Sequence, residues 1–205
     1  VASADQDDDF LAAREAYRAE DVARLEQLAE KFKSSPLEPY LTYYQLRLRL
    51  YTRNPEGVKE FLARPDDTPV IDQLRSEWLK MQARQRRWDA FAAEYPRLLE
   101  ADDEMKCYAL QAHLPNSVDQ VLHEARNFWF SGKGQPESCV TLFNMALGTG
   151  VISEQDVWQR MRLALESNNI ALAKQLSEHL PKERKIKSSI LENAAAHPDR
   201  YLANL

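Results

Sequence analysis

Glycine, cysteine and long apolar runs are all scarce in this chain of 205 residues. It has two cysteines, neither in a CxxC pair, which excludes a small scaffold held by several disulfides. No apolar run reaches the length of about 18 residues that a membrane-spanning helix needs, so no integral membrane segment is predicted. The four histidines are scattered without an HExxH motif or a Cys/His cluster, and we therefore predict no structural or catalytic metal site.

Neither sign of charge dominates the sequence. Acidic residues number 32 and basic residues 27, which gives a formal net charge of -5. A mildly acidic surface has no general attraction for nucleic acid or anionic membrane, so neither is predicted as a partner. The first residues, VASADQDDDF, lack the apolar core of a signal peptide, and we expect residues 1–9 to form an N-terminal extension.

The chain is instead rich in helix-forming residues such as Ala, Leu, Glu, Gln and Arg. Apolar residues recur at steps of three and four, which is typical of amphipathic helices, and no stretch alternates strictly as a strand would. The sequence therefore predicts an all-α fold. Two of the stripes consist of Leu37, Leu41, Tyr44, Leu48 and Tyr51, and of Val157, Met161, Ala164 and Leu165.

Short turns separate these helices. Ser153 followed by Asp156 resembles a capping box, and the pair Asn168-Asn169 can end one helix and begin the next. Short connections make sequential helices antiparallel neighbours. We expect residues 10–205 to form a superhelical α-solenoid of short antiparallel helix pairs, with an irregular α-domain as the alternative. No fixed repeat period is present.

Three segments are candidates for binding, and each also has a structural interpretation. The tyrosines Tyr40, Tyr43 and Tyr44 could stack on a sugar, but core packing is the better explanation. Arg84–Trp88 could contact phosphate or carboxylate, although cations also complement the end of a helix. Pro181–Lys187 is basic enough for a partner surface, and an exposed helix face is the default interpretation.

The acidic clusters predict no catalytic centre. Asp7–Asp9 and Asp102–Glu104 precede helical stretches, where negative charge stabilises a helix N-terminus. The sequence has no Gly-rich phosphate loop, GxSxG elbow or Cys-His nucleophile pair. We therefore predict no catalytic residue and no cofactor-binding residue from the motifs alone.

Three segments of the chain carry a resemblance to a known family: LEPYLTYYQLRLRL (Leu37 to Leu50), NFWFSGKGQPESCVTLF (Asn127 to Phe143) and VWQRMRLALESNN (Val157 to Asn169). Together they resemble the N-terminal part of soluble lytic murein transglycosylases. The middle segment is the most specific, because it combines an aromatic helix end, a Gly-Lys turn, Gln-Pro and a cysteine. The similarity runs through most of the chain from about Phe10.

The resemblance implies a periplasmic setting and an enzymatic parent. Members of the family cleave the bond between N-acetylmuramic acid and N-acetylglucosamine in peptidoglycan and leave a 1,6-anhydromuramoyl product. Their long ring of helices surrounds a separate, lysozyme-like catalytic domain at the C-terminal end. In this chain the Glu-Ser pairs, Glu137-Ser138 and Glu166-Ser167, lack the family's catalytic context, so no catalytic residue is carried over.

The resemblance also implies a disulfide between Cys107 and Cys139, because both lie at positions that look like cysteines of the family and the periplasm is oxidising. Two buried free thiols are the alternative. In this interpretation the residues Gly132, Gly134 and Pro136 turn the chain sharply, and Cys139 opens the next helix.

The sequence thus predicts a non-catalytic helical scaffold of a lytic transglycosylase, with glycan strands, the parent's own catalytic domain, or both as partners. The alternative is a helical-repeat adaptor that binds another protein and no glycan. Because the last residues, near Tyr201 and Leu202, are apolar rather than a polar cap, we expect the native protein to continue beyond Leu205.

Overall fold

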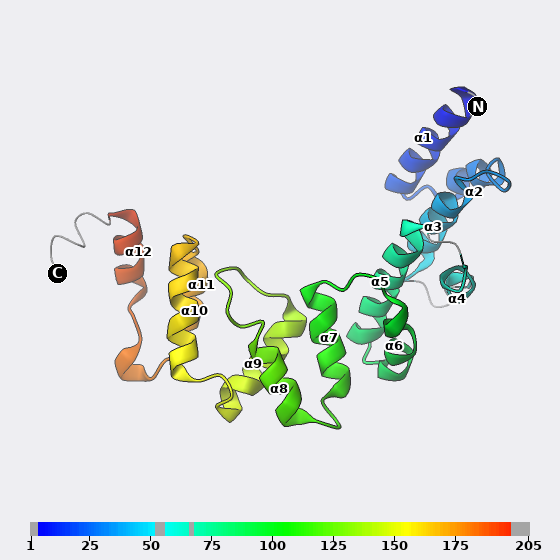
Figure 1. Ribbon diagram of the computed structural model, residues 1–205. Helices are drawn as coiled ribbons and strands as arrows, with labels where there is room; N and C mark the ends of the chain where they lie inside the picture. Colours follow the sequence, from blue (N-terminus) through cyan, green and yellow to red (C-terminus); the bar gives the residue numbers. More distant parts are fainter. Residues whose placement is uncertain (1–3, 52–55, 66–67, 198–205) are drawn as a thin grey trace. The chain divides into compact units, whose positions relative to one another are not determined.

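The structure is a computed structural model that describes residues 4–51, 56–65 and 68–197. Within these ranges every regular element is helical and no strand occurs, as Figure 1 shows, which confirms the all-α prediction. The chain divides into two compact units, Val1–Glu100 and Ala101–Leu205. No helix of the described ranges is long and apolar enough to cross a bilayer.

Unit 1 is built by helices that pack on the next helix along the chain or on the one after it. Helix α1 contacts α2 and α3, α3 contacts α5, and α5 contacts α4 and α6. A buried cluster of Ala13, Ala16, Leu25, Phe32 and Leu41 forms the core of its first three helices. The elements are α1 (Ala4–Arg18), α2 (Val22–Glu30), α3 (Glu38–Arg49), α4 (Val58–Leu62), α5 (Pro69–Arg84), α6 (Trp88–Glu94) and the 3-10 helix η1 (Tyr95–Arg97).

Unit 2 has one continuous core. Helices α7, α8 and α9 contact one another, and α11 contacts both α10 and α12. Apolar residues from all six helices join in a single buried cluster that includes Trp129, Phe143 and Met161. The elements are α7 (Asp103–His113), α8 (Val118–Arg126), α9 (Glu137–Thr149), α10 (Glu154–Glu166), α11 (Ile170–Ser177), the 3-10 helix η2 (Lys182–Arg184) and α12 (Ser188–Ala196).

Polar caps define where several helices begin. The Ser153 hydroxyl accepts from the Asp156 backbone N–H while the Asp156 carboxylate accepts from the Ser153 N–H, so the capping box is confirmed. Asn168 adopts a left-handed backbone with φ 55°, and Asn169 caps α11 by accepting from Leu172 N at 3.2 Å. Such caps contribute about 1 kcal/mol each.

Three expectations need correction or lie outside the described residues. Helix α1 begins at Ala4, so Asp7–Asp9 lie inside a helix instead of preceding one, and residues 4–9 belong to that helix. Of Pro181–Lys187, only Lys182–Arg184 is helical, as a single 3-10 turn, because Ile186 bonds to the Ser177 hydroxyl instead of continuing a helical ladder. The apolar C-terminal residues near Tyr201 lie outside the described residues.

Candidate binding sites

The loop of residues 127–136, here called the connecting loop, joins α8 to α9 and packs on α10. Gly132 lies so close to α10 that a Cβ atom would clash with the Ser167 hydroxyl and the Leu163 carbonyl. The Asn169 side chain also donates to the Gly132 carbonyl at 3.3 Å. Glycine is therefore required at position 132 by close approach, whereas at Gly134 a Cβ would meet nothing within 4 Å.

Asp156, in the first turn of α10, anchors the start of the connecting loop. Its carboxylate accepts two hydrogen bonds from the Arg126 guanidinium, at 2.6 and 3.0 Å. Its backbone carbonyl accepts from the Trp129 indole N–H at 2.9 Å. The Arg126 hydrogen bonds hold the pKa of Asp156 below its ordinary value, against the opposing effect of burial. The loop is thus fixed to α10 by a charge-assisted pair and a buried indole.

The two cysteines of the chain join two helices of unit 2. Cys107 of α7 and Cys139 of α9 are joined by a disulfide with an S–S distance of 2.00 Å and a Cα–Cα distance of 5.1 Å. Both side chains are fully buried. Cys139 lies in the first turn of α9, which begins at Glu137. The bridge ties the end of the connecting loop to an earlier helix.

Arg160 of α10 is the most unusual charged residue of unit 2. It is only 4% exposed. Its guanidinium lies 4.5 Å from the Trp129 ring centroid and 5.3 Å from that of Phe143. It donates from Nε and Nη2 to the carbonyls of Ser131 and Lys133, each at 3.3 Å. No carboxylate of the described ranges pairs with it, and burial lowers its pKa to about 10.

A small pocket of about 170 Å³ opens beside this guanidinium, and we call it the Arg160 pocket. Its lining contains no acidic residue. Desolvation, followed by repulsion from Arg160, lowers the pKa of the neighbouring His179. The pocket is thus a positively charged site in an acidic chain. It is lined by Trp129, Gly134, Gln135, Val140, Phe143, Asn144, Leu147, Arg160, Leu172, Gln175, Leu176 and His179.

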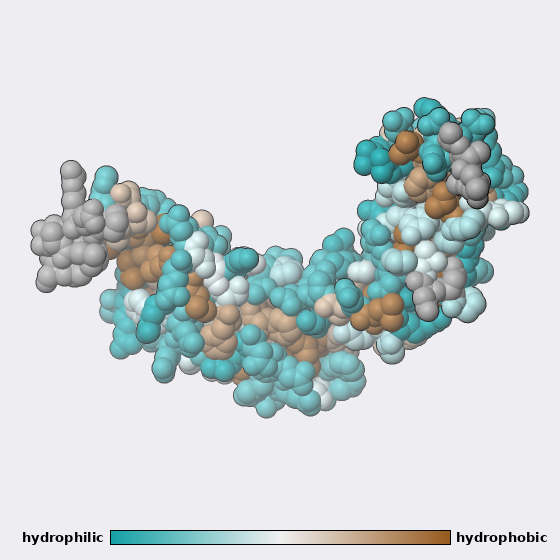
Figure 2. Space-filling model, turned by 45° about the horizontal axis from the view of Figure 1, so that its top comes forward, coloured by the Kyte–Doolittle hydropathy of each residue, from teal (hydrophilic) through white to brown (hydrophobic). Residues whose placement is uncertain are grey.

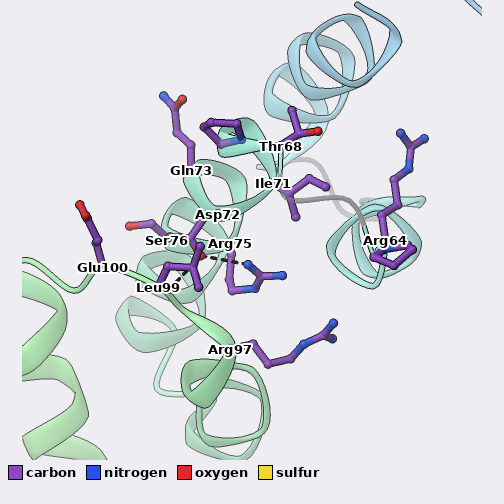
Figure 3. Close-up of a pocket in the computed structure, with 12 residues that line it drawn as sticks. Arg64, Thr68, Ile71, Asp72, Gln73, Arg75, Ser76, Arg97, Leu99 and Glu100 are labelled. Atoms are coloured by element: carbon purple, nitrogen blue, oxygen red, sulfur yellow. Dashed lines mark hydrogen bonds and ion pairs between the residues drawn. The ribbon is translucent and has the colours of Figure 1, made fainter. Parts of the chain in front are cut away.

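Unit 1 holds a larger and more open groove of about 660 Å³, between the end of α4, α5 and the segment after η1 (Figure 3). Its central cation, Arg75, is 6% exposed and donates to Asp72 at 2.9 Å, to Glu94 at 2.8 Å and to the Leu62 carbonyl at 2.9 Å. Two carboxylates therefore neutralise this buried cation. Polar side chains at the edge of the groove, among them Gln73 and Glu100, remain exposed.

The three tyrosines pack in the core of unit 1, as the sequence predicts. Tyr43 is buried and donates to Glu77 at 3.0 Å, and burial followed by the Glu77 charge raises its pKa. Tyr44 stacks on Tyr17 with a centroid distance of 4.5 Å, while Tyr40 meets Phe10 edge to face. Neither Tyr40 nor Tyr44 is more than partly exposed, so core packing is confirmed.

The other sequence candidates are dispersed. Arg84 lies in the last turn of α5, and Asp102 caps α7 by accepting from Met105 N at 2.8 Å, both as expected from the helix dipole. Glu137 begins α9 and Glu166 ends α10, and both side chains are exposed. Nowhere in the described ranges do three or more His, Cys, Asp or Glu side chains gather in a way that could hold a metal ion.

Sequence reasoning did not identify Arg160. Its position carried a signal, because Arg160 lies three residues after Val157 and four before Ala164, on the buried stripe of α10. A cation on an apolar stripe needs a partner. The partner, however, is a pair of loop carbonyls and two aromatic rings, and no spacing rule in the sequence brings those to one place.

Comparison with known proteins gives one consistent relationship, although no family model matches the chain. The chain is 26% identical to the soluble lytic murein transglycosylase of Escherichia coli K12 over 210 aligned positions, which cover 98% of the chain and 32% of the relative. It is 27% identical to the Salmonella typhimurium protein of the same name, over 87% of the chain and 28% of that relative.

Solved structures agree with this relationship. An inactive mutant of the lytic transglycosylase Slt from Pseudomonas aeruginosa superimposes with a TM-score of 0.73 and 30% identity, over 96% of this chain and 32% of that one. The 70-kDa soluble lytic transglycosylase of E. coli shares the fold with a TM-score of 0.74 at 24% identity. The chain spans about a third of the length of these relatives.

The near-complete alignments and the shared fold therefore lead to the same conclusion: the chain is homologous to the N-terminal helical region of soluble lytic murein transglycosylases.

Proposed function

We propose that this chain is the non-catalytic helical scaffold of a periplasmic peptidoglycan lytic transglycosylase. The observation that carries the proposal is the alignment, which covers 98% of the chain but only 32% of the E. coli enzyme. The parent enzyme would cleave the bond between N-acetylmuramic acid and N-acetylglucosamine and release 1,6-anhydromuropeptides. The buried Cys107–Cys139 disulfide supports an oxidising compartment such as the periplasm.

The scaffold would act by holding a glycan strand, the catalytic domain of the same protein, or both. Packed helix pairs supply a stable surface, and hydrophilic residues cover most of the face seen in Figure 2. The groove of unit 1 suits an uncharged polymer, because its buried Arg75 is already neutralised and its exposed Gln73 and Arg97 can donate to hydroxyl groups.

Intact peptidoglycan sacculi provide the test. The purified chain should sediment with sacculi, and mass spectrometry of the supernatant should find no anhydromuropeptides. The double variant Gln73→Ala/Arg97→Ala should sediment several-fold less, while Arg162→Gln, an exposed change in unit 2, should sediment as the parent does.

Two outcomes would contradict parts of the proposal. Release of anhydromuropeptides would contradict the non-catalytic role and direct attention to the glutamates of the chain, beginning with Glu166. A chain that stays in the supernatant at every sacculus concentration would contradict the glycan-holding role, and would leave the catalytic domain of the same protein, or another protein bound by a helical adaptor, as the partner.

A further inference from the structure

We infer that the Arg160 pocket binds a carboxylate on a short apolar stem, such as the C-terminal end of a peptide. The first reason is the charge of the pocket. Arg160 is 4% exposed and has no carboxylate partner within the described ranges. The nearby Glu178 is already paired with Lys185 at 2.7 Å. A buried cation without a counter-charge is costly for a fold to keep, unless an anion completes it.

The second reason is the orientation of the guanidinium. Trp129 and Phe143 hold the Arg160 guanidinium at 4.5 and 5.3 Å, and the carbonyls of residues 131 and 133 accept from Nε and Nη2. Nη1 has no hydrogen-bond partner in the described part of the protein. It is also not fully enclosed, so a ligand can reach it. A planar, fixed guanidinium with a free N–H edge is suited to a carboxylate.

The third reason is the lining, which selects the rest of the ligand. The pocket holds about 170 Å³, enough for a small terminal group and too little for a drug-sized molecule. Val140, Leu172 and Leu176 present apolar side chains to a short stem. Asn144 and Gln175 present amides that can pair with a peptide bond. A terminal residue with a small side chain, such as alanine, fits all of these features.

Calorimetric titration of the whole chain tests this inference with N-acetyl-alanine, its carboxamide and inorganic phosphate as probes. We expect N-acetyl-alanine to bind at least about tenfold more tightly than the carboxamide, because only the acid forms a charge-assisted pair with Arg160. Phosphate should bind less tightly than the acid, since it lacks an apolar stem. Equal binding of the acid and the carboxamide, or no binding of either, would overturn the inference.

Variants locate the binding. Arg160→Gln should reduce the affinity for N-acetyl-alanine about tenfold or more, and Arg162→Gln, an exposed arginine two residues further along α10, should leave it unchanged. If Arg160→Gln fails to fold, Gln175→Trp replaces it, because the exposed Gln175 lines the pocket and a larger side chain there would obstruct it. Full affinity in either folded pocket variant would overturn the inference.

An NMR titration that measures the pKa of His179 distinguishes ligand binding from a purely structural role of Arg160. If the role is only structural, adding the acid should leave this pKa unchanged. Burial lowers the pKa of His179, the positive charges of Arg160 and Lys185 lower it further, and Glu178 raises it. A carboxylate bound beside Arg160 adds negative charge, so N-acetyl-alanine should raise this pKa and the carboxamide should not. An unchanged pKa at saturation would mean that the acid binds elsewhere.

The D and L forms of N-acetyl-alanine distinguish two sources of the carboxylate. Tighter binding of the D form would indicate a cell-wall peptide, and tighter binding of the L form an ordinary protein C-terminus. Either result supports the carboxylate site. The inference does not depend on the proposed scaffold function, because a chain that fails to sediment with sacculi can still bind the free acid.

Discussion

Each unit buries an arginine almost completely, and the two units treat that charge in opposite ways. In unit 1, Arg75 is enclosed by the carboxylates of Asp72 and Glu94. In unit 2, Arg160 meets two carbonyls and two aromatic rings, and no carboxylate among the described residues pairs with it. A cation that is fully paired by its own fold stabilises that fold, whereas a cation left without a counter-charge remains available to a ligand.

The units also differ in how their helices are tied together. Unit 2 combines the Cys107–Cys139 disulfide with the close approach of Gly132 to α10. Unit 1 has no disulfide, since both cysteines of the chain lie in unit 2. Instead, Arg75 of α5 is held to α6 by its ion pair with Glu94 and to the end of α4 by its hydrogen bond to the Leu62 carbonyl. A change that removes one kind of tie should therefore weaken one unit and spare the other.

The largest loss of stability should follow when Arg75, like Arg160, is left without a carboxylate partner. The double variant Asp72→Asn/Glu94→Gln leaves a buried cation without a carboxylate, and breaking a buried pair in this way costs about 3–5 kcal/mol. Urea unfolding measures the loss, with the exposed Glu100→Gln as the control from the same groove. A loss below about 1 kcal/mol, the value of a surface pair, would mean that Arg75 is solvated in solution.

Removal of the disulfide should lower the free energy of unfolding by a similar amount, and this loss should be confined to unit 2. The double variant Cys107→Ser/Cys139→Ser opens a bridge of sequence separation 32, for which chain entropy gives about 3–4 kcal/mol. Native-state hydrogen exchange should show faster opening of α7 and α9 and unchanged opening of α1 and α2. Mass analysis of the folded parent chain that finds two free thiols would exclude the bridge.

The two glycines of the connecting loop allow a matched comparison, with a smaller expected change in stability. Gly132→Ala should destabilise the chain by about 1–3 kcal/mol, because the new methyl group clashes with the α10 backbone. Gly134→Ala meets open space and should be neutral or stabilising by up to about 1 kcal/mol. Thermal unfolding measures both variants, and equal losses would mean that the loop does not rest on α10.

The smallest expected effect is the loss of stability at low pH that follows protonation of Asp156. Its pKa is lowered by Arg126, so its contribution to stability is complete above the unfolded pKa of about 3.9 and is lost as the pH falls through the lower folded value. Because Arg126 is partly exposed, we expect only about 1 kcal/mol. Asp156→Asn should flatten this part of the pH–stability curve, and an unchanged slope would contradict the pairing.

Local signals in the sequence were sufficient for the helices and their caps. The Ser153–Asp156 capping box and the Asn168-Asn169 junction were predicted because each involves residues at most three positions apart. For α3, the sequence predicted only one of the two buried faces. Tyr43 and Leu46, on another face, are also buried, because α3 packs against α1 and α2 on one side and α5 on the other. A single periodicity cannot show two buried faces.

Local sequence patterns could not predict the Arg160 pocket, because the residues that line it are far apart in the sequence. Its lining comes from the connecting loop, α9, α10, α11 and the residue His179, which are up to 50 positions apart in the sequence (from Trp129 to His179). The segment around Pro181–Lys187 shows the same limit on a smaller scale, since its bond partner Ser177 lies nine residues before Ile186. Contacts of this kind are fixed by tertiary packing.

The most direct test of the contrast between the two arginines is the free energy of unfolding of Arg75→Met and Arg160→Met, measured by urea under the same conditions. We expect Arg75→Met to lose about 3–5 kcal/mol, because it leaves two carboxylates unpaired, and Arg160→Met to lose far less, because it also removes an uncompensated buried charge. An Arg160→Met loss equal to or larger than that of Arg75→Met would contradict the contrast and make Arg160 a structural residue.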